Sequence, residues 1–260
     1  MPFHSKNGIR YFTFESLEKG AIHAIVTRQG GVSRAPYESL NVGGTVGDDP
    51  ECVRENRLRM FAALERQVES NFDVWQVHGN TIVCTDKPRL PNEAHIKADG
   101  ILTNNPGVTL MMRFADCVPI LLVDPIKKVV GILHAGWQGT LKNITGEAIS
   151  KMQSVYGTKP EYVVAGIGPS IGPDHYTVGK EVFEIGKPLF KDELSEVFSE
   201  SDSKIHLDLW KANELLLRRA GIHKVLQSRI CTACDTHRWF SHRAEAGKTG
   251  RFGALIGLKQ

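Results

Sequence analysis

Three side chains that can bind a metal ion or act as nucleophiles stand at or just after the ends of apolar segments. His78 follows segment 72–77, Cys117 follows segment 108–115, and His134 ends the run that begins at residue 129. Two imidazoles and one thiolate are the ligand set of a catalytic zinc site, in which a fourth position stays open for water or substrate. Their spacing is far longer than in a zinc finger, so this hypothesis requires the fold to bring the three residues together.

The same residues also have a purely structural interpretation. Histidines at strand ends can simply be satisfied by hydrogen bonds, and a free cysteine is commonly a small buried residue. Asp116, directly before Cys117, can accept the N–H of a metal-bound imidazole, or it can cap a turn. The residue types alone leave both interpretations open.

The elements that must position these residues follow from the periodicity of the apolar side chains. Strand-like runs lie at 22–26, 72–77, 81–85, 100–103, 108–114, 119–123, 129–133, 162–167, 224–230 and 252–258. Helices are predicted from Pro50 to Val68 with Asp49 as the cap, from a Thr140 cap to Gly157, from Asp208 to Gly221, and over 181–190. The strands come in groups between the helices, and no linker or repeat divides the chain. This pattern predicts a single α+β domain over residues 1–260 with mixed β-sheets.

Composition and charge exclude several classes of protein. Hydrophobic residues make up 41% and charged residues 23% of the 260 residues, which is typical of a globular protein and not of a disordered or fibrous one. The 32 basic and 29 acidic residues are spread along the chain, so we expect a small-molecule partner and no nucleic acid. The most apolar stretch, 108–123, contains Arg113 and Asp116 and is too short to span a bilayer, so no membrane partner is expected either.

The five cysteines indicate a reducing compartment. An odd number in a chain of this length does not make a disulfide framework, and the N-terminus has no signal-peptide pattern, so we expect a cytoplasmic protein. Cys231 and Cys234 form a lone C-x-x-C pair, which fits a redox pair or half of a metal site. Because no second pair accompanies them, we interpret both as structural thiols.

Several short motifs occur in a fixed order along the chain. They are Gln76-Val77-His78-Gly79, Ala115-Asp116-Cys117-Val118-Pro119, His134-Ala135-Gly136-Trp137-Gln138-Gly139-Thr140, Gly168-Pro169-Ser170-Ile171, Phe240-Ser241-His242-Arg243 and Thr249-Gly250-Arg251. Together they resemble the family of multicopper polyphenol oxidase (laccase domain) proteins, also called purine nucleoside phosphorylases or peptidoglycan editing factors. The resemblance begins near Ser39-Leu40-Asn41 and covers nearly the whole chain.

The resemblance implies mixed sheets layered between helices (α/β/β/α), with a zinc ion held by His78, Cys117 and His134. It also implies action on adenosine, inosine, guanosine and methylthioadenosine, by phosphorolysis at the ribose C1′ and, for adenosine, by deamination at C6. The three metal ligands and Asp116 are the expected catalytic residues. The residues expected to bind substrate or phosphate are Asn41, Arg57, Arg243 and Arg251, of which the arginines offer guanidinium groups that suit phosphate.

The resemblance does not fix the metal or the reaction. None of the ten histidines forms the His-x-His pairs of multicopper oxidases, so zinc is preferred to copper. Gln138 stands where the family usually has Arg, which removes one positive charge from the expected anion pocket. Two alternatives stay open: a thiol hydrolase with Cys117 as nucleophile and His134 as base, and an amidase acting on a peptidoglycan precursor. The oligomeric state is also open.

Overall fold

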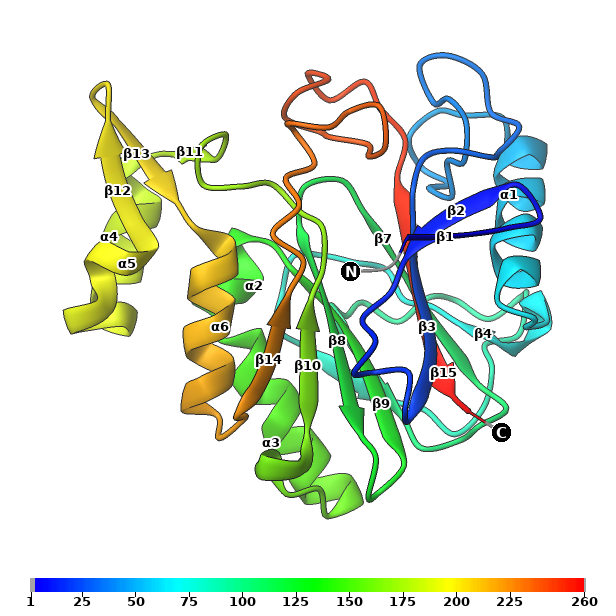
Figure 1. Ribbon diagram of the computed structural model, residues 1–260, viewed down its shortest axis with the longest axis horizontal. Helices are drawn as coiled ribbons and strands as arrows, with labels where there is room; N and C mark the ends of the chain where they lie inside the picture. The colour runs from blue at the N-terminus through cyan, green and yellow to red at the C-terminus, as the bar shows by residue number, and fades with distance from the viewer. Residues whose placement is uncertain (1–2, 260) are drawn as a thin grey trace.

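Two six-stranded β-sheets pack face to face in the computed structural model, which describes residues 3–259 (Figure 1). The strand order of the first sheet is β1 (Phe3–Lys6), β2 (Ile9–Phe12), β3 (Ala21–Val26), β15 (Phe252–Leu258), β7 (Thr109–Phe114) and β4 (Asn71–Phe72). The order of the second sheet is β14 (Lys224–Gln227), β10 (Val164–Ile167), β8 (Val118–Asp124), β9 (Val129–Ala135), β6 (Gly100–Thr103) and β5 (Ile82–Cys84). Both sheets are mixed, because β4–β7, β5–β6 and β10–β14 are parallel pairs among antiparallel ones.

Helices cover the outer faces of both sheets. Helix α1 (Pro50–Ala63) packs on the first sheet, where Met60 and Phe61 are buried against β3 and β15. Helices α3 (Ile144–Tyr156) and α6 (Leu209–Arg219) pack on the second sheet, and a separate apolar cluster fills the space between the sheets. This arrangement confirms the predicted α+β class and its α/β/β/α layers (Figure 1).

The remaining elements are short. A three-stranded sheet, β11 (Thr177–Val178), β13 (Lys204–Leu207) and β12 (Phe198–Ser201), lies with α4 (Lys180–Phe190) and α5 (Leu194–Val197) at one side of the molecule (Figure 1). Helix α2 (Trp137–Leu141) and three 3-10 turns, η1 (Val68–Ser70), η2 (Pro160–Tyr162) and η3 (Lys191–Glu193), complete the described chain. Within residues 3–259, no helix is both long and apolar enough to cross a membrane.

The four predicted helices are present, although α1 ends at Ala63 and not at Val68, which begins the turn η1. Asp49 caps α1 by accepting the backbone N–H of Glu51, and Asp208 caps α6 in the same way. The prediction that Thr140 caps a helix is wrong. That residue lies inside the short helix α2, and α3 begins at Ile144, where Asn143 is the cap and its side chain accepts the N–H of Gly146.

One strand prediction is also wrong. The apolar segment 72–77 pairs as a strand only over Asn71–Phe72. Beyond it, the fully buried carboxylate of Asp73 forms ion pairs with Arg89 and Arg113 at 2.9 and 2.8 Å, and the chain leaves the ladder. The signal against a continuous strand was this charged residue inside the apolar run.

Two connections cross from the first sheet to the second, and each carries a residue of the proposed metal site. The connection from β4 to β5 and the connection from β7 to β8 each lead from the first sheet to the second. His78 lies on the former connection and Cys117 on the latter. Two of the three residues proposed to bind metal are therefore carried by crossings between the sheets.

Candidate active site

The structure brings together the side chains of His78, Cys117 and His134. One ligand atom from each residue lies within 4.8 Å of the others. Cys117 directly precedes β8, and His134 lies near the end of β9, where the antiparallel register pairs it with Pro119. His78 arrives from the other crossing and has a positive φ of 59°, so a tight turn presents its ring to the two strands. The fold therefore brings the three side chains together, as a shared metal site requires.

Asp99 fixes the positions of both histidines. Its buried carboxylate accepts the backbone N–H groups of Val77, His78 and Gly79 at 3.2, 3.0 and 2.6 Å, so the turn that carries His78 wraps around it. It also lies 2.8 Å from Nδ1 of His134. A proton on Nδ1 donated to this carboxylate leaves Nε2 as the free donor atom of His134.

Sequence analysis missed Asp99 and gave its role to Asp116. The antiparallel register of β6 and β9 pairs Gly100 with Leu133, which places Asp99 beside His134. That neighbour relation becomes visible only when the strand pairing is known. An acidic residue directly before a buried strand was the one local signal.

Asp116 has a different set of partners. Its carboxylate accepts the hydroxyls of Thr232 and Ser241, both at 2.7 Å, and the backbone N–H of Arg243 at 2.6 Å. Its backbone carbonyl accepts the N–H of Ile171 at 3.0 Å. Asp116 lines the same cavity as the three donors, but its carboxylate joins loops there, and among residues 3–259 it has no hydrogen bond to an imidazole.

Cys117 and His134 are electrostatically coupled. Burial by itself raises the pKa of the thiol, but the charge of His134 and hydrogen bonds from both histidines outweigh burial and lower the pKa of Cys117 below its usual value. Burial by itself lowers the pKa of His134, but the charge of Cys117 and the hydrogen bond to Asp99 raise it. The two shifts have opposite directions, and both favour the charged pair of thiolate and imidazolium over the neutral pair.

The three donors open into a cavity of about 690 Å³. A volume of this size accommodates a ligand of a few hundred daltons. Trp75, Trp137 and Tyr176 line its walls, and Trp75 is 48% exposed. The aromatic faces and the donor cluster thus share one open space.

Four arginines line the same cavity: Arg57, Arg113, Arg243 and Arg251. Three of them were predicted, whereas Arg113 was noted only as a charge that interrupts an apolar stretch. Arg57 is held by two hydrogen bonds from Nε and Nη2 to the carbonyl of Val42, at 3.1 and 2.9 Å, and within the described chain its Nη1 has no hydrogen-bond partner. The walls of the cavity are therefore well supplied with positive charge.

Asn41 and Gln138 lie outside the lining of the cavity. The carboxamide of Asn41 is fully buried, and its oxygen accepts the backbone N–H groups of Gly43 and Arg251 at 2.9 and 2.8 Å. Its amide nitrogen donates to Asp48. Asn41 therefore positions the backbone that carries Arg251, and its own side chain does not line the cavity.

The sequence as a whole matches a known family model. The model is described as multi-copper polyphenol oxidoreductase laccase and aligns with residues 22–259. The chain belongs to this family. The resemblance found in the short motifs is thereby confirmed.

Two relatives in this laccase family are named purine nucleoside phosphorylases. The YlmD protein of Geobacillus stearothermophilus is 38% identical over 250 residues, which cover 93% of this chain and 91% of the relative. The protein of Deinococcus radiodurans is 39% identical over 237 residues, which cover 91% and 88%. The crystal structure of YlmD from Geobacillus stearothermophilus superimposes with a TM-score of 0.93 at 35% identity, over 99% of both chains.

Proposed function

We propose that the protein is a zinc-dependent purine nucleoside phosphorylase that also deaminates adenosine. The observation that carries the proposal is the donor cluster of His78, Cys117 and His134 at a cavity walled by tryptophans and arginines. The names of the relatives support phosphorolysis. The proposed substrates are adenosine, inosine, guanosine and methylthioadenosine, together with phosphate.

The donor set fits zinc. Two imidazoles and one thiolate are soft and borderline donors that zinc accepts, and three protein ligands leave a position for substrate. A metal held here supplies Lewis acidity at the cavity. Asp99 keeps His134 in the tautomer that ligation needs, since its carboxylate lies on the Nδ1 side of the ring.

The walls of the cavity provide for both substrates. Trp75 and Trp137 offer aromatic faces for stacking against a purine. The arginines offer positive charge to phosphate. Nη1 of Arg57 has no hydrogen-bond partner within residues 3–259 and is available to donate to a phosphate oxygen. In phosphorolysis a phosphate oxygen forms a bond to C1′ while the bond from C1′ to the purine nitrogen breaks, which gives ribose 1-phosphate and the free base.

The test is a product analysis with each of the four nucleosides, with and without phosphate, on protein whose zinc content has been measured. We expect free base and the sugar 1-phosphate only when phosphate is present: ribose 1-phosphate from three of the nucleosides and 5-methylthioribose 1-phosphate from methylthioadenosine. Adenosine and water should give inosine and ammonia in both cases. The Cys117→Ser variant should lose both activities, and Cys52→Ser, a free cysteine that does not line the cavity, should keep them. Zinc-loaded protein that forms none of these products contradicts the proposal.

One observation favours a second candidate, a thiol hydrolase or amidase. Asp99, His134 and Cys117 are connected in the order acceptor, base and thiolate, as in catalytic triads. In such an enzyme, which could act on a peptidoglycan precursor, His78 would have no chemical role. Rapid alkylation of Cys117 by iodoacetamide in protein as purified supports this candidate, whereas protection by stoichiometric zinc supports the phosphorylase.

A further inference from the structure

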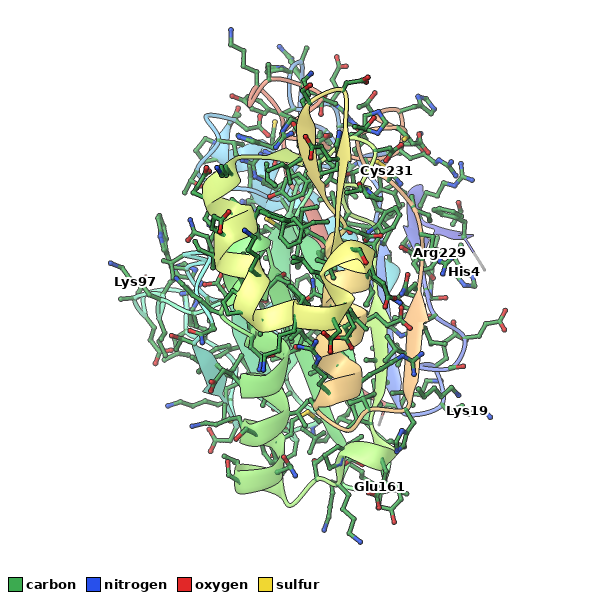
Figure 2. The ribbon with its side chains drawn as sticks, turned by 90° about the vertical axis from the view of Figure 1, so that its left-hand side faces the viewer. His4, Lys19, Lys97, Glu161, Arg229 and Cys231 are labelled. Atoms are coloured by element: carbon green, nitrogen blue, oxygen red, sulfur yellow. The ribbon has the colours of Figure 1, made fainter. Side chains whose placement is uncertain are left out.

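A second group of metal-competent side chains lies apart from the first. Asp174 and His175 from the loop after β10, and Cys231 and Cys234 from the segment after β14, place one donor atom each within 4.8 Å of the others. Cys231 lies toward the same end of the molecule as the β12–β13 hairpin (Figure 2). We propose that these four residues bind a second zinc ion, which has a structural role.

The distances between the donors match tetrahedral zinc coordination. Bonds of about 2.3 Å to sulfur and about 2.0 Å to nitrogen or oxygen place sulfur about 3.6 Å from nitrogen or oxygen, and nitrogen about 3.3 Å from oxygen. Nδ1 of His175 lies 3.9 Å from Sγ of Cys231 and 3.5 Å from Sγ of Cys234. Oδ2 of Asp174 lies 3.7 Å from Sγ of Cys234 and 3.0 Å from Nδ1 of His175. Every one of these separations is within a few tenths of an ångström of the zinc geometry.

The surroundings also suit a metal-bound thiolate. The backbone N–H of Gly172 donates to Sγ of Cys231 at 3.1 Å, a hydrogen bond that stabilises negative charge on sulfur. A Cβ at position 172 would lie 2.7 Å from the carboxylate of Asp174, so a larger residue there would displace this ligand. The side chains of Asp174 and His175 are 62% and 44% exposed, so a metal ion can enter from solvent.

The sequence by itself offers only ligands that lie close to Cys231 and Cys234 along the chain. A second C-x-x-C pair was the expected complement, and His237, which follows Cys234 in the sequence, contacts Gln29. The fold supplies Asp174 and His175 instead, from a distant loop. With four protein ligands the site is closed, and closed zinc sites are structural.

The site joins two segments that form a wall of the cavity. Tyr176, next to His175, lines the cavity, and Arg243 donates to the carbonyls of His175 and Thr177 at 3.4 and 3.1 Å. On the other segment, Thr232 donates to Asp116. A metal ion between these segments therefore holds Tyr176 and Arg243 in place beside the first site.

The metal content of the full chain tests the proposal. In protein purified without chelators we expect about two zinc ions per chain, falling to about one in the Cys231→Ser/Cys234→Ser variant and to about one in Cys117→Ser. The control Cys52→Ser/Cys84→Ser, which removes two other free cysteines, should keep both ions. Amide hydrogen exchange over residues 171–177 should become faster in the first variant and stay unchanged in the control.

Two results overturn the proposal. One is a single zinc ion in the wild type that Cys117→Ser removes. The other is a Cys231–Cys234 disulfide in peptides from protein kept under reducing conditions, which would make the pair a stable disulfide and leave no thiolates for a metal ion. If the double serine variant does not fold, His175→Ala replaces it, because that side chain is exposed. In this variant one of two ions should be released by a weaker chelator, and equal retention of both contradicts the assignment. None of these measurements depends on the proposed activity.

Discussion

Replacing Asp99 with asparagine should destabilise the protein and weaken metal binding at the first site together. One oxygen of the carboxylate accepts the N–H of His78 and faces Nδ1 of His134, and the other accepts the N–H groups of Val77 and Gly79. An asparagine keeps only one oxygen. Whichever way its amide is oriented, an NH2 group replaces the acceptor of two neighbouring nitrogens.

The magnitude follows from these contacts. A buried N–H donor without an acceptor costs about 1 to 3 kcal/mol. An NH2 group turned toward Val77 and Gly79 leaves two such donors, whereas one turned toward His134 leaves only that of His78, because Nδ1 of the ring can accept from it. The second orientation costs less, and it lowers the free energy of unfolding by about 1 to 3 kcal/mol. If the NH2 group faces His134, the ring must accept at Nδ1 and carry its proton on Nε2, which blocks ligation. Loss of such a supporting contact typically lowers metal affinity about 10- to 100-fold.

The assay is urea unfolding of metal-free protein followed by tryptophan fluorescence, and competitive titration of zinc against a chromogenic chelator. Asp124→Asn is the matched control, because Asp124 is also fully buried. Its Oδ1 accepts the N–H groups of Ile126 and Lys127, and within the described chain its Oδ2 has no partner that an amide would lose. This variant should unfold within about 1 kcal/mol of the wild type.

The reasoning is refuted if Asp99→Asn matches the control in both measurements. A loss of stability with unchanged zinc affinity would show that Asp99 supports the turn without setting the tautomer of His134. Weaker zinc binding with unchanged stability would show that Asp99 sets the tautomer of His134 without stabilising the turn. Only a joint loss agrees with a carboxylate shared between the turn and the imidazole.

Three further predictions concern the cavity and the core. Gly136→Ala should lower zinc affinity about 10-fold or more, because the new Cβ would lie 2.9 Å from Sγ of Cys117. The control Gly44→Ala should bind zinc normally, because its Cβ would lie 3.7 Å from the nearest atom. In steady-state assays, Arg57→Met should raise the KM for phosphate about 10-fold or more, because a charged donor is removed, while adenosine deamination continues. The control Arg59→Met removes only an exposed ion pair and should change neither the KM for phosphate nor the deamination rate. Burial lowers the pKa of His23 from 6.5 to about 4, so the unfolded chain takes up the proton first, and stability should fall by about 3 kcal/mol as the pH drops through that window. Between pH 7 and pH 4, the free energy of unfolding measured with denaturant should decrease less in His23→Gln than in the wild type. Equal decreases in the two proteins would contradict the lowered pKa of His23.

The sequence determined the elements whose signals are local. The strands at 100–103 and 252–258 and the helix from Asp208 have the predicted bounds, because apolar periodicity and a capping side chain act within a few residues. The same local logic failed for 72–77, where the partners of Asp73 lie elsewhere in the chain. It also misplaced one helix start, since Thr140 and Asn143 are both acceptable caps and only the fold selects between them.

Residue type and position at strand ends marked His78, Cys117 and His134 as candidates in the sequence, but left a structural interpretation open. Only the tertiary structure decided that Asp99, and not Asp116, supports His134, because that contact depends on the register of β6 against β9. The same holds for the group of Asp174, His175, Cys231 and Cys234, whose halves come from loops far apart in the chain. The sequence specifies the chemical type of each side chain. Its partners on other strands and loops depend on the register in which the backbone hydrogen bonds pair, and this register is a property of the whole fold.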